Sequence, residues 1–141
     1  MTEETIKKIE VEVLVNKDPK EVWKHWTETD HIKNWNHATE EWHTPSAEND
    51  LKVGGAFSYR MEAKDGSMGF DYSGNYDHID EKKKLSFTLD DGRKVDISFI
   101  EEGSKTRIVE VFEAEPESPL ELQKNGWQSI LNNFKNYAES H

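Results

Sequence analysis

The stretch that decides the fold is residues 57–76, FSYRMEAKDGSMGFDYSGNY. On both sides of its Asp65-Gly66 pair, apolar and polar residues alternate one by one, which is typical of a strand with one buried face. An Asp-Gly pair between two such runs favours a two-residue hairpin turn of type I′, in which both central residues take positive φ. The stretch therefore predicts two antiparallel strands whose large side chains share one face: Phe57, Tyr59 and Met61 on the first, and Met68, Phe70, Tyr72 and Tyr76 on the second.

The alternation continues towards the C-terminus, in the runs 85–89 and 95–99 that flank Asp91-Gly92. After Glu102-Gly103, a denser apolar run spans residues 108–112. Successive runs joined by short turns predict successive hairpins. We therefore expect the segment from about residue 38 to about residue 115 to form an antiparallel meander of about six strands.

Upstream of the meander, residues 9–15 alternate as one further strand. The tetrapeptide at residues 18–21, Asp-Pro-Lys-Glu, then predicts a helix start, with Asp at the N-cap, Pro at the first helical position and Glu at the third. Val22, Trp23 and Trp26 follow at helical spacing, and a second cap is expected at Thr29-Asp30. Two short helices should therefore follow the first strand.

After Pro119 the apolar period returns to that of a helix, for about 18–20 residues. One face of this helix carries Trp127, Ile130, Leu131, Phe134 and Ala138. An antiparallel sheet with one apolar face needs a cover, and this helix is long enough to provide it. The expected fold class is α+β.

Composition limits the function. The chain has 141 residues and a formal net charge of −11, and we expect one domain over residues 1–141 with a flexible N-terminus at residues 1–5. So acidic a chain is a poor partner for nucleic acid. Cysteine is absent, which excludes disulfides and thiol catalysis. The chain has neither a stretch of about 18 apolar residues, needed for membrane insertion, nor the apolar region of a signal peptide, so a cytoplasmic location is expected.

The apolar residues are unusually rich in rings, with five Trp, four Tyr and six Phe. A core of large rings is hard to fill without gaps, so an internal cavity is expected. Ordinary core packing is the alternative for the same residues. The candidate ligand-binding residues are Trp35, Trp42, Phe57, Tyr59, Met61, Phe70, Tyr72, Phe87, Phe99, Trp127, Ile130 and Phe134.

Polar residues give weaker signals. His37 and His43 could flank the cavity as a general base or as metal ligands, but no histidine pair has the spacing of a zinc site, so we expect neither a metal nor a cofactor. Arg60, Asp71 and Asp77 alternate with the rings and should face solvent. A β-bulge that shifts the alternation would instead turn Arg60 inward, where it could hold a ligand carboxylate. Gly126 lies within a predicted helix, where glycine costs about 1 kcal/mol, which indicates a close approach by the sheet or a ligand.

Five motifs in order resemble the activator of heat-shock-protein-90 ATPase homologue-like family of the SRPBCC superfamily, over residues 6–139. They are DPKEVW (18–23) with Trp26 and Trp35, AENDLKVGGAF (47–57), GNY (74–76), KTR (105–107) and GW (126–127). The resemblance implies a helix-grip fold, in which a curved antiparallel sheet wraps around the long C-terminal helix and leaves a cavity between them. It also implies a hydrophobic or amphipathic ligand, and the family name suggests a role in the stress response.

The function expected on these grounds is non-covalent binding of a small hydrophobic or aromatic molecule in that cavity. One alternative is an enzyme of the polyketide cyclase or isomerase type, which needs a polar residue facing inward with a shifted pKa. Another is a chaperone-accessory module that binds a protein partner, or a second copy of the chain, through an exposed apolar patch.

Overall fold

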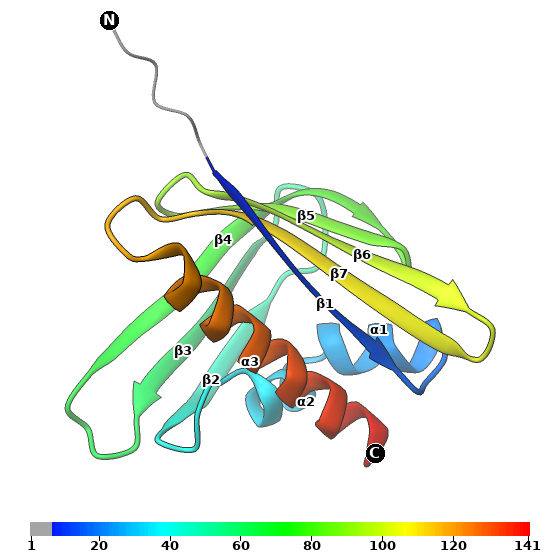
Figure 1. Cartoon of the computed structure of the whole chain (residues 1–141), viewed down its shortest axis with the longest axis horizontal. Coiled ribbons are helices and arrows are strands. Elements are labelled where there is room, and N and C mark those ends of the chain that lie inside the picture. The colour runs from blue at the N-terminus through cyan, green and yellow to red at the C-terminus, as the bar shows by residue number, and fades with distance from the viewer. Residues whose placement is uncertain (1–6) are drawn as a thin grey trace, which may run out of the picture.

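The computed structural model describes residues 7–141, so the N-terminus expected to be flexible, residues 1–5, lies outside the described part of the chain. The fold is α+β and its element order confirms the prediction (Figure 1). In chain order the elements are β1 (Lys8–Val15), α1 (Pro19–Thr27), α2 (Thr29–Trp35), β2 (Trp42–Asn49), β3 (Ala56–Ala63), β4 (Gly69–Asp80), β5 (Lys84–Leu89), β6 (Lys94–Glu102), β7 (Lys105–Glu113) and α3 (Leu120–Glu139).

The seven strands form one antiparallel sheet in the order β1-β7-β6-β5-β4-β3-β2. The sheet curls, and α3 lies across its concave side (Figure 1). α3 packs along the edge strand β1, and α2 packs against the opposite edge strand β2. The two helices thus hold the edges of the curled sheet and leave the middle of the concave face to line an interior space.

The first helix begins as the sequence predicts. The Asp18 side chain is the N-cap and accepts a hydrogen bond from the Glu21 backbone N–H at 2.9 Å, and Pro19 begins the helix. The chain does break and restart before α2, but the expected cap at Thr29-Asp30 is wrong: the N-cap is Glu28, which makes no side-chain capping bond.

The hairpin between β3 and β4 differs from the predicted type I′ turn. Gly66 has a φ of 78°, whereas Asp65 does not have positive φ. The connection is a longer loop, closed by the Ala63 N–H on the Met68 carbonyl at 3.0 Å, and the Asp65 carboxylate accepts from the Ser67 N–H at 2.8 Å. Met68 consequently lies in the loop with 66% of its surface exposed, instead of on the inner face of a strand.

The inner face of α3 packs as predicted. Leu131, Phe134 and Ala138 are buried, and the Phe134 ring lies edge-on to Trp26 at 4.7 Å and to Trp35 at 5.0 Å between ring centres. This contact joins α3 to both short helices. No helix within residues 7–141 combines the length and the apolar character needed to span a membrane.

Candidate ligand-binding cavity

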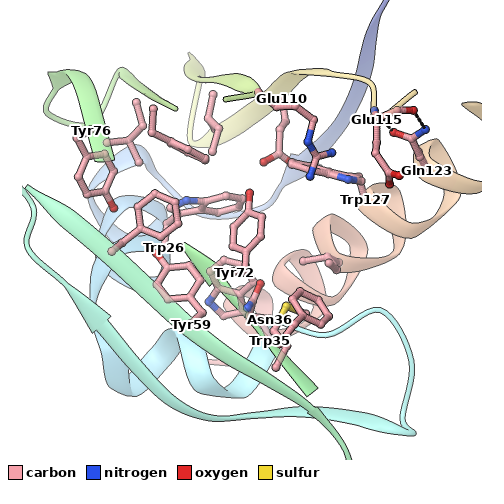
Figure 2. A pocket seen from close by; sticks show the side chains of 18 residues that line it. Trp26, Trp35, Asn36, Tyr59, Tyr72, Tyr76, Glu110, Glu115, Gln123 and Trp127 are labelled. Carbon is pink, nitrogen blue, oxygen red and sulfur yellow. Dashed lines mark hydrogen bonds between the residues drawn. The ribbon is translucent and has the colours of Figure 1, made fainter. Parts of the chain in front are cut away.

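A cavity of about 260 Å³ lies between the concave face of the sheet and the helices (Figure 2). Its walls come from all three helices, from strands β3 to β7 and from the loops near Arg93 and Glu115. Half of its eighteen lining residues are aromatic: Trp26, Trp35, Phe57, Tyr59, Phe70, Tyr72, Tyr76, Phe87 and Trp127.

The cavity brings together nine of the twelve residues expected to bind a ligand, namely Trp35, Phe57, Tyr59, Met61, Phe70, Tyr72, Phe87, Trp127 and Ile130. The other three do not line it. Phe134 and Phe99 are buried against Trp26, with Phe99 at 5.7 Å between ring centres, and belong to the packed core. Trp42 is half-buried and lies against Phe70 at 5.9 Å.

The aromatic wall is held by ring-to-ring contacts. Phe57 lies 4.9 Å from Phe87 and 5.4 Å from Tyr76 between ring centres. Trp127 on α3 stacks on Phe112 of β7, with ring centres 3.8 Å apart and planes 9° apart. These rings therefore pack on one another as well as facing the cavity.

Three tyrosine hydroxyls belong to this wall. Tyr76 donates a hydrogen bond to the Asn49 Oδ1 at 2.6 Å, and burial raises the pKa of this phenol to about 12. Burial also raises the pKa values of Tyr59 and Tyr72 well above the ordinary value for a phenol. All three therefore act as neutral hydroxyls near neutral pH.

Glu110 is the site residue that the sequence analysis missed. It lies on β7 and faces the cavity with only 7% of its surface exposed, and its cross-strand neighbours are Val11 and Ile97 (Figure 2). Its carboxyl group makes no hydrogen bond or ion pair with any described residue. Burial raises the pKa of Glu110 to about 8, so the side chain is mostly a neutral acid at pH 7.

The polar end of the cavity is completed by Arg93, Glu115 and Gln123. The Arg93 guanidinium donates to the Asp91 carboxylate at 2.7 Å. Gln123 on α3 accepts from the Glu115 N–H at 2.7 Å and donates to the Glu115 carbonyl at 2.8 Å, which ties the loop after β7 to the helix (Figure 2). Arg93 also acts on Tyr72: burial and then Glu110 raise the pKa of this phenol, and Arg93 lowers it.

The histidines take no part in this cavity, since none of its lining residues is a histidine. His25 bonds through Nδ1 to the Glu21 carbonyl at 2.6 Å, and His43 lies 4.0 Å from Glu62. His37 has a buried Nδ1 without a partner among residues 7–141, but it lies outside the lining. His37 and His43 are therefore not among the residues that line this cavity. Within residues 7–141, no three His, Asp or Glu side chains are grouped to hold a metal ion.

Arg60 and Gly126 were also singled out in the sequence. Arg60 pairs with Glu62 at 2.8 Å and with Asp71 at 3.5 Å, away from the cavity, as expected for the outer face. A close approach of the sheet to Gly126 is wrong, because no atom of the described chain lies within 4 Å of the position that a Cβ would occupy, whereas an approach by a ligand stays a prediction. One helical turn away on either side are Gln123 and Ile130, which line the cavity.

Comparisons with known proteins agree with this fold. Residues 16–139 match the family model described as "Activator of Hsp90 ATPase homolog 1-like protein". The solution structure of the AHSA1-like protein from Aeromonas hydrophila is 42% identical, with a TM-score of 0.90 over 95% of this chain and 93% of that chain. Chr148 from Cytophaga hutchinsonii is 51% identical, with a TM-score of 0.83 over 94% and 92%. A crystal structure from Nitrosomonas europaea, 18% identical over 94% of both chains, has the same fold with a TM-score of 0.82. No curated protein matches the chain.

Proposed function

The chain belongs to the activator of Hsp90 ATPase homolog 1-like family, and we propose that it binds a small aromatic molecule in the cavity between the sheet and α3. The single observation that carries this proposal is an interior space of about 260 Å³ whose wall is half aromatic. Small-molecule sites have this character, with an apolar wall and a few polar groups that fix orientation. Here Tyr59, Tyr72 and Glu110 provide those groups.

The volume sets the size of the ligand. An apolar cavity of about 150 Å³ in a protein interior holds benzene, so a space of about 260 Å³ suits a compound with one or two rings. Each Å² of apolar surface removed from water contributes about 25 cal/mol, and stacking on the rings adds to this. Sterols and long acyl chains need more room.

A thermal-shift and fluorescence experiment tests the proposal. Indole and naphthalene derivatives should raise the melting temperature, because a ligand that binds only the folded state at 100 times its Kd adds about 2.7 kcal/mol. Tryptophan emission should change as well, since Trp26, Trp35 and Trp127 line the cavity. If a panel of one-ring and two-ring compounds produces neither effect, the cavity is not a binding site.

A pair of variants at Gly126 controls for folding. Gly126→Ala should leave binding unchanged, because one methyl group meets nothing at this position. Gly126→Leu should weaken binding while the protein remains folded, since the longer side chain extends from the same helix face as Gln123 and Ile130. Equal binding by both variants would mean that the ligand does not reach this part of α3.

Glu110 favours a second candidate function, an acid–base enzyme of the isomerase type. A carboxyl with a pKa of about 8 can donate a proton to a carbonyl oxygen or, when ionised, remove a proton from carbon. An aromatic ketone such as 2-tetralone should then exchange its α-hydrogens with deuterated solvent faster in the presence of the protein. If the wild-type protein does not accelerate this exchange, or if Glu110→Gln accelerates it equally, Glu110 has no such role.

Binding of a protein partner has less support. The exposed large apolar side chains belong to four separate segments: Leu51 and Val53, Met68 and Phe70, Ile100, and Leu120 and Leu122. A docking surface needs these groups side by side. The four segments lie apart in the sequence, which does not by itself place these groups together on the surface, whereas the cavity does bring its lining residues together.

A further inference from the structure

We propose that the ligand is an organic cation, a one-ring or two-ring aromatic compound with a positively charged nitrogen held by the Glu110 carboxylate. This inference rests on the proposed function, because it names the chemical class that the same cavity takes. It follows from the lone carboxyl group, from the faces of the surrounding rings and from the charges at the polar end of the cavity.

The Glu110 side chain has no polar partner among the described residues. Its neighbours across β1 and β6 are the apolar residues Val11 and Ile97, and no described residue donates a hydrogen bond to it. A buried carboxylate is stable only when it is paired. Because its side chain faces the cavity, the partner that this group lacks can come from the ligand.

An aromatic ring lies in the cavity wall together with the Glu110 carboxyl group. Trp127 of α3 lines the cavity together with Glu110 (Figure 2), and one face of its ring stacks on Phe112 of β7, with ring centres 3.8 Å apart. Aromatic faces attract cations through the negative charge of the ring face, and tryptophan does so best. A carboxylate beside such rings matches an organic ammonium ion better than a neutral or an acidic molecule.

The charges at the polar end of the cavity favour a cationic ligand over an acidic one. Glu110 and Glu115 are acids, and the cation Arg93 already pairs with Asp91 at 2.7 Å. Within the described lining, no other cation remains to hold an acidic ligand. The net charge of −11 also concentrates cations around the protein and repels anions.

Cation binding should depend on pH, because Glu110 attracts a cation only when its carboxyl group is ionised. With a pKa of about 8, about one molecule in ten carries the charged form at pH 7 and about nine in ten at pH 9. The other titratable or charged groups of the lining are Tyr59, Tyr72, Tyr76, Arg93 and Glu115. The tyrosines have raised pKa values and stay neutral across this range, and arginine stays charged. The affinity for a permanent cation should therefore rise about ninefold from pH 7 to pH 9.

The experiment compares phenyltrimethylammonium with tert-butylbenzene, which has the same shape without the charge. Dissociation constants are measured by tryptophan fluorescence at pH 7 and pH 9. We expect the cation to bind more tightly than the neutral compound at pH 9, and to gain about ninefold from the lower to the higher pH, while the neutral compound gains nothing. Glu110→Gln should remove the gain. Glu101→Gln, at an exposed position of β6, removes the same charge and should keep it.

The outcomes separate a failure of the cation inference from a failure of the proposed function. If tert-butylbenzene binds and the cation binds no better at pH 9, the cation inference is overturned while the proposed function stands. If the cation binds equally well to wild type and Glu110→Gln, with circular dichroism showing both folded, Glu110 is not its partner and the inference also falls. If neither compound binds, the proposed function and the inference fail together.

Discussion

Replacing Glu110 with Gln should change how the stability of the protein depends on pH. The unfolded chain exposes this carboxyl at its ordinary pKa of 4.5, whereas burial raises the pKa in the folded state to about 8. Between these values the unfolded state loses the proton and the folded state keeps it. A raised pKa therefore contributes stability that is fully present below pH 4.5 and is lost as pH rises to about 8.

The size of the effect follows from the same two values. Each pH unit between them is worth about 1.4 kcal/mol, so wild type loses about 3 kcal/mol of this contribution by pH 7, about 4 kcal/mol by pH 8 and about 5 kcal/mol above pH 9. The free energy of unfolding of a protein domain is only about 5–15 kcal/mol, so this loss is a large part of it. Glutamine has nearly the same shape and does not ionise, so any cost of burying its amide is the same at every pH.

Urea unfolding, followed by tryptophan fluorescence at pH 5, 6, 7, 8 and 9, measures this difference. The stability of Glu110→Gln relative to wild type should rise by about 1.4 kcal/mol per pH unit up to pH 8 and then level off. The control, Glu101→Gln, should give a flat difference because water hydrates this exposed carboxylate in both states. A difference for Glu110→Gln that stays constant from pH 5 to pH 8 would refute the burial of an unpaired carboxyl group.

Three further substitutions test the fold. Gly126→Ala should raise the free energy of unfolding by about 1 kcal/mol, since no described atom lies within 4 Å of the new methyl group, and a drop in melting temperature would contradict this. Asp18→Ala removes the capping bond to the Glu21 N–H and should cost about 1 kcal/mol in urea unfolding, whereas Asp18→Asn should cost little. Phe134→Ala empties a fully buried position against Trp26 and Trp35 and should cost about 3–5 kcal/mol; a loss below 1 kcal/mol would mean that α3 is loosely packed.

Most of the fold could be predicted because its signals are local. The alternation in β3 and β4 lies within a few residues on either side of a glycine turn, and the Asp18-Pro19 helix start needs only its own neighbours. The period of α3 marks its buried face, which Leu131 and Phe134 confirm. The exact hairpin loop was not predictable, because Asp65 makes its bond to Ser67 instead of taking positive φ.

The cavity could be predicted only in part. Nine of the expected residues line it, since inward rings on adjacent strands meet wherever the sheet curls. Phe99 and Phe134 also point inward, but α1 fills the space beside them with Trp26, and that packing has no signal in local sequence.

Glu110 was missed for a different reason. Residues 108–112 read Ile-Val-Glu-Val-Phe, so both faces of the strand are apolar and the alternation does not show which side is inward. The pairing of Glu110 with Val11 and Ile97 decides the side, because those residues belong to the buried faces of β1 and β6. Aligning the predicted strands by their neighbours could have found the acid; the strand alone could not.

An acid that lowers stability at neutral pH needs a reason to face the cavity. Leucine would fill the same place between Ile108 and Phe112 without any cost of ionisation, so packing alone does not select Glu110. Sites that bind ligands commonly keep groups that weaken the fold. Glu110→Leu should therefore raise the free energy of unfolding at pH 7 by about 3 kcal/mol and abolish the preference for phenyltrimethylammonium, while tert-butylbenzene still binds. If the leucine variant is instead less stable than wild type at pH 7, the carboxyl group supports the fold itself, and its position beside the cavity needs no ligand to explain it.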